Sequence, residues 1–101
     1  MQDIDYFMNL SGNSADRTVS LMSEFKRLCK SLNKINEDNC NLPSSARRDK
    51  REQGLLSRAA EIAKELSCKL HHTGDPRGHA IRLIRPDGRY NCWDGETWAI
   101  D

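Results

Sequence analysis

The sequence has no long apolar run, and this absence excludes one class of protein at the outset. None of its hydrophobic stretches approaches the roughly 20 residues that a membrane-spanning helix needs. The N-terminal segment carries Asp3 and Asp5 where a signal peptide would carry a basic region followed by an apolar one. We therefore expect a cytoplasmic protein with no membrane contact.

The sequence also lacks the common catalytic and cofactor motifs. No glycine-rich loop leads from an expected strand into a helix, so a phosphate cradle or dinucleotide fingerprint is not expected. There is no G-x-S-x-G nucleophile motif and no C-x-x-C pair. We expect the four cysteines to be reduced thiols, because they are far apart and have no secretory context. These absences predict a protein that is not an enzyme and that holds no metal or cofactor.

Large excess charge is absent as well. The net charge is +1, which argues against a polyanion mimic or a strongly basic nucleic-acid binder. At 101 residues the chain has room for one domain with a single small core. Because 31% of the residues are charged, we expect part of the chain to be exposed helix or solvated tail.

Two long helices are predicted in the first two thirds of the chain. Residues 14–36 begin with the potential N-cap Ser14 and carry one apolar stripe at helical spacing. The stripe consists of Leu21, Phe25, Leu28, Leu32 and Ile35. Residues 37–44 break this pattern at Pro43, and a second helix is expected over 45–67. The short connection predicts an antiparallel helix hairpin.

Alternating patterns follow and predict short strands over 68–73, 79–85 and 89–93. A turn at Pro86-Asp87-Gly88 joins the last two. The expected fold is therefore α+β, an antiparallel helix hairpin packed on a small three-stranded antiparallel sheet. Trp93 and Trp98 are expected to anchor the sheet edge.

Residues 1–13 are expected to form an N-terminal apolar tail, separate from a single α+β domain over 14–101. Disordered tails are usually poor in apolar residues, but this one contains Tyr6 and Phe7. It would either fold back over an exposed patch of the domain or serve as a docking peptide for a partner.

The segment Gly74-Asp75-Pro76-Arg77-Gly78 is dense in residues that restrict or permit unusual backbone angles. Turn chemistry accounts for every residue in it except Arg77. The guanidinium of Arg77 would lie in a solvated turn or pair with an aspartate. Alternatively, it would bind an anion or a protein partner from a rigid turn.

The histidines near this turn raise the question of a metal or acid–base site. A zinc site from Cys68, His72 and Cys92 is conceivable but lacks the usual ligand spacing. A metal-dependent nuclease hairpin is disfavoured, because no helix follows to supply a second histidine. An acid–base pair of His72 and His79 with Asp75 is a minor alternative.

A nucleic-acid interface is the main alternative to a protein-binding role. The start of the second helix carries a basic cluster that could follow phosphates. Its members are Arg47, Arg48, Lys50, Arg51 and Arg58. Asp49 and Glu52 interrupt the cluster, so a solvated helix end with local ion pairs is the simpler interpretation.

Residues 20–100 resemble a group of small phage-encoded proteins that have no assigned activity. The resemblance rests on "DNCNLPSSARRDKREQGLLSRAAEIAKEL" and "GDPRGHAIRLIRPDGRYNCWDGETWAI". It implies a phage accessory protein that binds a host or phage protein within the host cytoplasm. The segment "MQDIDYFMNLSG" looks like an addition to the shared pattern.

Together these observations predict a non-enzymatic phage accessory protein that binds and modulates a host or phage protein complex, such as a host defence system. Arginine and aromatic residues dominate protein interfaces, and they guide the expected contact surface. That surface comprises His72, Asp75, Arg77, His79, Trp93, Trp98, Tyr6 and Phe7. A homodimer formed through the apolar stripe of the first helix is also possible.

Overall fold

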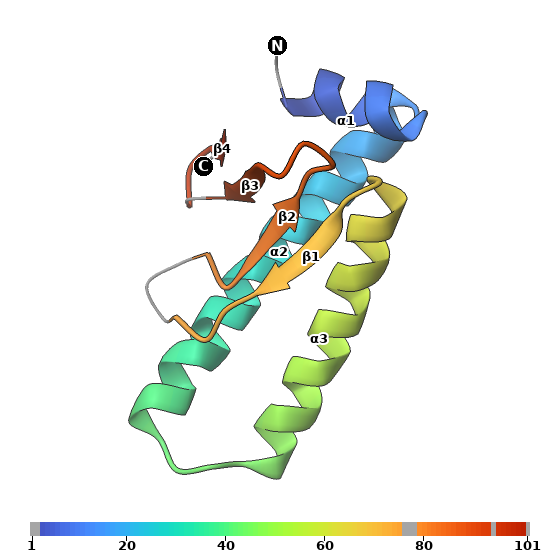
Figure 1. Cartoon of the computed structure of the whole chain (residues 1–101). Coiled ribbons are helices and arrows are strands. Elements are labelled where there is room, and N and C mark those ends of the chain that lie inside the picture. Colours follow the sequence, from blue (N-terminus) through green and yellow to red (C-terminus); the bar gives the residue numbers. More distant parts are fainter. Residues whose placement is uncertain (1–2, 76–78, 94, 101) are drawn as a thin grey trace.

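The computed structural model describes residues 3–75, 79–93 and 95–100. Three helices come first: α1 (Asp3–Ser11), α2 (Ala15–Asn41) and α3 (Ala46–Glu65). Four strands follow: β1 (Lys69–His72), β2 (Ile81–Ile84), β3 (Tyr90–Trp93) and β4 (Trp98–Ile100). Figure 1 shows α2 and α3 as a long antiparallel hairpin, with the sheet lying against its upper half. The α+β class is therefore confirmed.

The sheet is a meander in the order β1-β2-β3-β4, with all pairs antiparallel. The prediction of three strands was wrong, because the closing segment adds β4 and pairs Trp98 with Trp93. Gly95 has a φ of 100°, a value that suits glycine, at the reversal between β3 and β4. A three-residue strand is too short for alternation to reveal it in the sequence.

Helix α2 extends five residues beyond its predicted end at residue 36. Its last turns are polar and carry no apolar period, but nothing in them stops a helix. Lys34 pairs with Glu37 and Asp38 along the surface, and the Leu42 N–H bonds to Asp38 O at 2.8 Å. Pro43 then prevents continuation.

The core lies between the hairpin and one face of the sheet. All five residues of the predicted stripe on α2 are buried there. Ala59 and Ala63 on α3 are also buried, and their small side chains let the two helices approach closely. Ile81 and Leu83 of β2 close the core from the sheet side with no exposed surface. Burying each such aliphatic side chain contributes about 1.5–3 kcal/mol.

The segment expected to be a tail is helix α1, and it packs on the domain. Phe7 lies in the core with 0% of its surface exposed. Asp3 accepts a hydrogen bond from Asn91 of β3 at 2.9 Å. Phe7 was expected to contact a partner, but a side chain without exposed surface is not accessible to one in this conformation. Within the described residues, no helix is both long and apolar enough to cross a membrane.

Candidate binding loop

The connection between β1 and β2 is fixed at its base by its own backbone. The Thr73 N–H donates to Ala80 O at 2.9 Å, which extends the ladder one step beyond β1. The Asp75 N–H donates to Thr73 Oγ1 at 2.9 Å, as in other turns in which a threonine hydroxyl caps the backbone. The backbone at the two ends of the loop, at Thr73 and Ala80, is therefore held in place by hydrogen bonds.

Two asparagines of α2 hold this loop from below; we call Asn33 and Asn36 the asparagine clamp. Asn36 Nδ2 donates to Thr73 O at 3.0 Å and to Asp75 O at 3.1 Å. Asn33 Oδ1 accepts from the Ala80 N–H at 2.8 Å. The two residues are three positions apart, so they lie on the same face of the helix. One asparagine thus fixes the entry to the loop and the other fixes its exit.

The asparagine clamp places polar groups where the helix otherwise buries apolar ones. Asn36 is only 2% exposed, and it follows the buried Ile35 directly. Burying an amide is unfavourable unless it is hydrogen-bonded, and each bond that is made stabilises by about 0.5–1.5 kcal/mol. These amides bond to backbone at Thr73, Asp75 and Ala80, so their structural effect is to fix the two described ends of the loop.

The exit of the loop is also strained. His79 has a φ of 57°, in the left-handed region that is uncommon for residues other than glycine, although histidine enters it more often than most. Its Nδ1 atom is buried and makes no hydrogen bond to any residue that the structure describes. Such backbone strain persists only where surrounding contacts hold it, and it is enriched at functional sites.

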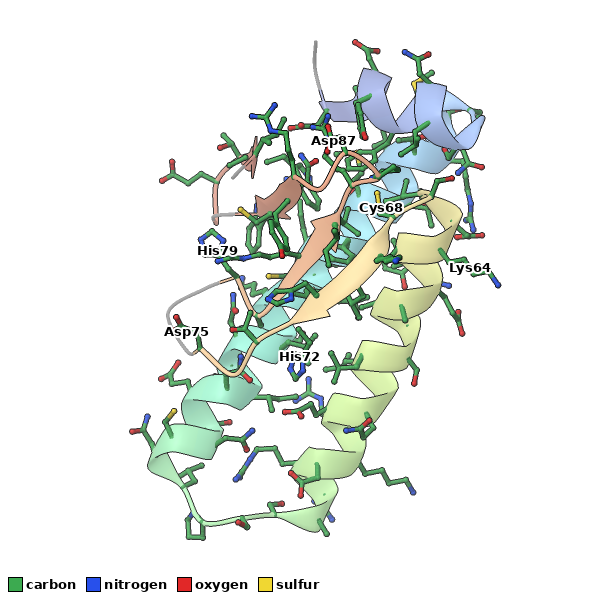
Figure 2. The ribbon with its side chains drawn as sticks, in the orientation of Figure 1. Lys64, Cys68, His72, Asp75, His79 and Asp87 are labelled. Carbon is green, nitrogen blue, oxygen red and sulfur yellow. The ribbon has the colours of Figure 1, made fainter. Side chains whose placement is uncertain are left out.

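The residues predicted from the turn lie around this loop. Asp75 and His72 are exposed, and His79 is partly buried. Figure 2 shows His72 and His79 on different sides of the loop, so the structure gives no support to an acid–base pair. Arg77, the residue on which the sequence argument depended most, lies outside the described residues.

The zinc alternative gains no support either. Within the described residues, no three histidine, cysteine or acidic side chains are close enough to hold a metal ion. Burial raises the pKa of the Cys68 thiol to about 11, whereas a metal ligand must be a thiolate. Cys92 is fully buried.

The two tryptophans form a cross-strand pair on the side of the sheet that faces α2. Trp98 lies 5.8 Å from the Phe25 ring, and Lys26 Nζ lies 5.9 Å from the centre of the Trp93 ring. Both indoles are partly exposed, so each has a packing role and a remaining accessible surface. The anchoring role expected for them agrees with these contacts.

Tyr6 is held by an arginine from the sheet. The Arg85 guanidinium stacks 3.6 Å from the centre of the Tyr6 ring and pairs with Asp87 at 2.9 Å. The side chain of Arg85 is only 9% exposed. This stack joins α1 to the β2–β3 turn, so Tyr6 has a structural role in addition to any contact with a partner.

The basic cluster of α3 separates into two groups. Arg58 forms a two-bonded ion pair with Glu24 of α2, at 2.6 and 2.8 Å, and also bonds Glu61. Arg48 bonds Asn39 Oδ1 and Pro43 O, which fixes the α2–α3 connection. The remaining members are exposed and form no ion pair with any described residue. They are Arg47, Lys50 and Arg51.

The asparagine clamp was missed from the sequence. Asparagine is common at helix ends and on helix surfaces, and Asn36 is the last residue of the predicted helix, with Asn33 one turn before it. The available signal was the position of Asn36 on the edge of the apolar stripe, next to Ile35. Its backbone partners lie 37 and 39 positions away and could be identified only from the fold.

Comparison of the chain with protein-family models, with curated proteins and with solved structures found no match. The resemblance to phage-encoded proteins therefore stays a prediction from the sequence.

Proposed function

We propose that this chain is a non-enzymatic binding protein that engages a protein partner through the β1–β2 loop. The observation that carries this proposal is the asparagine clamp, which holds the loop backbone at three atoms. Loop ends that are held before binding lose less conformational entropy when the loop docks, and this improves affinity. Binding residues are commonly placed on loops held by a rigid scaffold.

The sequence supplies the residue that would make the contact. Arg77 lies between the two clamped sides of the loop in the chain, and arginine is among the residues that contribute most to interface affinity. Asp75 and His72, which precede Arg77 in the sequence, provide exposed polar groups. The resemblance to phage accessory proteins suggests that the partner is a host or phage protein complex, such as a defence system.

The first test is capture of a partner from host lysate, with and without nuclease, followed by affinity measurement with the purified partner. We expect Arg77→Ala to weaken binding by about 30-fold or more, because hot-spot truncations cost about 2 kcal/mol or more. Its melting temperature should be unchanged. Arg89→Ala serves as the control, because Arg89 is exposed in a different turn.

A second variant tests the asparagine clamp itself. Asn36→Ala removes two hydrogen bonds to the loop and should lower both stability and affinity, whereas Arg77→Ala should lower affinity alone. Full partner affinity in both variants would overturn the proposed role of the loop.

Direct nucleic-acid binding through α3 is the second candidate function. Arg47, Lys50 and Arg51 are exposed at spacings of three and four, so they share one face of the helix. The triple variant Arg47→Gln/Lys50→Gln/Arg51→Gln should then lose affinity and show a shallower salt dependence on duplex DNA. A salt-independent interaction would exclude this candidate.

A further inference from the structure

Among the residues that the structure describes, no helix covers one face of the sheet. Ile81 and Leu83 point towards α2, where Cys29 Sγ lies 3.9 Å from Ile81 O. Side chains alternate along a strand, so the intervening residues lie on the opposite side. Figure 1 shows that side towards the reader, with α2 behind the sheet. We call its accessible part the open face, and its members are Lys69, His71, Arg82, Ile84, Tyr90 and Ala99. Cys92 lies on the same side but is fully buried.

Two aromatic rings meet in the middle of the open face. His71 of β1 and Tyr90 of β3 lean towards each other across β2, with ring centres 5.5 Å apart and planes at 68°. Both side chains are partly exposed. Rings in this arrangement present one flat surface and one edge to a ligand, which suits a planar group that stacks.

The open face has cationic groups and no acidic ones at its strand positions. Lys69 is exposed beside the rings and is available to a ligand. Arg82, which lies opposite His71 in the ladder, is only partly exposed and already interacts with another group. The carboxylate in the adjoining turn, Asp87, pairs with Arg85 at 2.9 Å. This charge pattern is complementary to a polyanion and unfavourable for a cationic partner.

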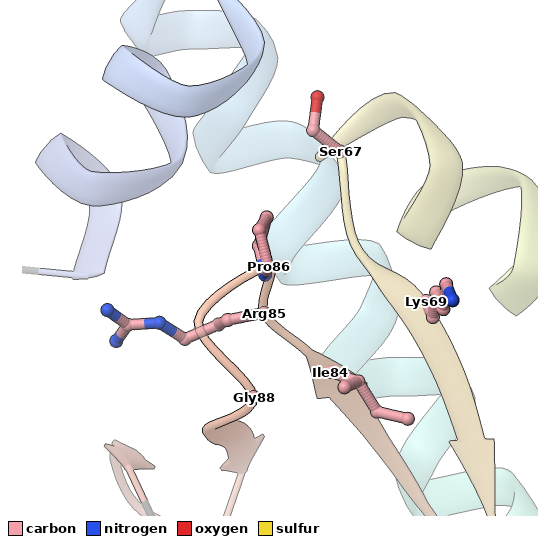
Figure 3. A pocket seen from close by; sticks show the side chains of 6 residues that line it. All are labelled: Ser67, Lys69, Ile84, Arg85, Pro86 and Gly88. Carbon is pink, nitrogen blue, oxygen red and sulfur yellow. The ribbon is translucent and has the colours of Figure 1, made fainter.

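A pocket of about 260 Å³ adjoins the ring pair. Figure 3 shows its lining, which consists of Ser67, Lys69, Ile84, Arg85, Pro86 and Gly88. Ile84 pairs directly with Tyr90 in the sheet, so the pocket and the rings are neighbours. Ile84 and Pro86 contribute apolar surface, and Lys69 contributes an ammonium group. The combination suits a heterocyclic base with a phosphate beside it.

We propose that the open face binds single-stranded nucleic acid. One base stacks on the Tyr90–His71 rings, the next enters the pocket over Ile84, and Lys69 neutralises the phosphate between them. Aromatic stacking beside basic groups is the general means of binding unpaired bases. A duplex keeps its bases stacked internally and offers none to this surface. The proposal goes beyond the loop-mediated function and does not depend on it.

The test is fluorescence anisotropy of labelled oligothymidine and oligouridine, each about 12 nucleotides long, across a salt series. Tyr90→Ala should weaken binding by about 5- to 150-fold, because one stacked base contributes about 1–3 kcal/mol. Tyr90→Phe should retain affinity, since the ring remains. Comparison of the two oligonucleotides distinguishes DNA from RNA as the ligand.

Lys69→Gln tests the charge without altering the core. It should reduce the slope of log affinity against log salt by about one and leave the melting temperature unchanged. Lys30→Gln, at an exposed position on α2, is the matched control and should change nothing.

Three outcomes would overturn the proposal. They are absence of saturable binding, equal affinity in Lys69→Gln and wild type at every salt concentration, and loss of binding only in the α3 triple variant. If the Tyr90→Ala variant still captures the protein partner, oligonucleotide binding by the open face is separate from partner binding by the β1–β2 loop. If Tyr90→Ala and Lys69→Gln lost the protein partner while wild type bound no oligonucleotide, the open face would be a protein interface instead.

Discussion

Ser67 illustrates how a single residue ends a helix. It follows α3 with a φ of 61°, and its N–H donates to Lys64 O at 3.0 Å. The next N–H, from Cys68, reaches back to Ala63 O at 2.8 Å. These two bonds define a left-handed helix end that usually contains glycine. Serine adopts this conformation at a cost in free energy, and the bonds hold it there.

Replacement of Ser67 by glycine should therefore stabilise the protein. We expect the free energy of unfolding to rise by about 0.5–1 kcal/mol, since glycine reaches the left-handed region without steric strain. Urea denaturation measures the change. Ser57→Gly, in the middle of α3, is a control of opposite sign, because glycine in a helix interior destabilises. Loss of stability in Ser67→Gly would show that the serine side chain makes a necessary contact.

At the scale of elements, α2 organises the molecule by using different faces for different neighbours. Its apolar stripe meets α3 and the sheet, the asparagine clamp holds the β1–β2 loop, and Glu24 binds Arg58 of α3. Arg58 lowers the pKa of Glu24 below its ordinary value through hydrogen bonding and charge. The helix hairpin is therefore joined by a titratable contact as well as by apolar packing.

This contact predicts a pH-dependent difference between wild type and Arg58→Gln. The pKa of Glu24 is lower in the folded state than in the unfolded state, so the pair stabilises fully above the unfolded value of about 4.3. Its contribution is lost as the pH falls through the lower folded value. We expect Arg58→Gln to have a lower melting temperature than wild type at neutral pH. The difference between the two melting temperatures should become smaller under acid conditions. For Arg51→Gln, on the same helix, the difference in melting temperature from wild type should not change with pH in this way.

The sequence predicted the elements that carry a long periodic apolar pattern and missed the elements that are too short to show one. The stripe from Leu21 to Ile35 spans four turns, so its period was unambiguous and the helix hairpin followed. Helix α1 has only nine residues, and β4 only three, and a pattern needs more length than that. The sites depend on pairing between segments. The Tyr90–His71 rings and the asparagine clamp come together only once the strands have a register.

At the scale of the whole molecule, α1 closes the end of the core next to the sheet. Phe7 is fully buried, Tyr6 stacks under Arg85, and Asp3 bonds Asn91. Figure 1 shows α1 lying across the top of the hairpin, above the sheet. The domain therefore includes residues that the sequence pattern assigned to a tail.

Phe7→Ala tests this integration. Removal of a fully buried phenylalanine typically costs about 3–5 kcal/mol, a large share of the stability of a domain of this size. Leu10→Ala, at a partly exposed position on the same helix, should cost clearly less. Denaturant unfolding of both variants measures the two losses in the free energy of unfolding. Similar small losses in the two variants would mean that α1 is not docked in solution.

The hydrogen bond between Asp3 and Asn91 joins residues 88 positions apart, and this separation has a consequence for synthesis of the chain. During translation α1 leaves the ribosome well before β3, which is one of its partners. The nascent chain therefore carries Phe7 without its complete binding surface until the sheet can form. Docking of α1 should therefore be completed only after β3 has been synthesised, and chaperones have an exposed aromatic helix to bind during that interval.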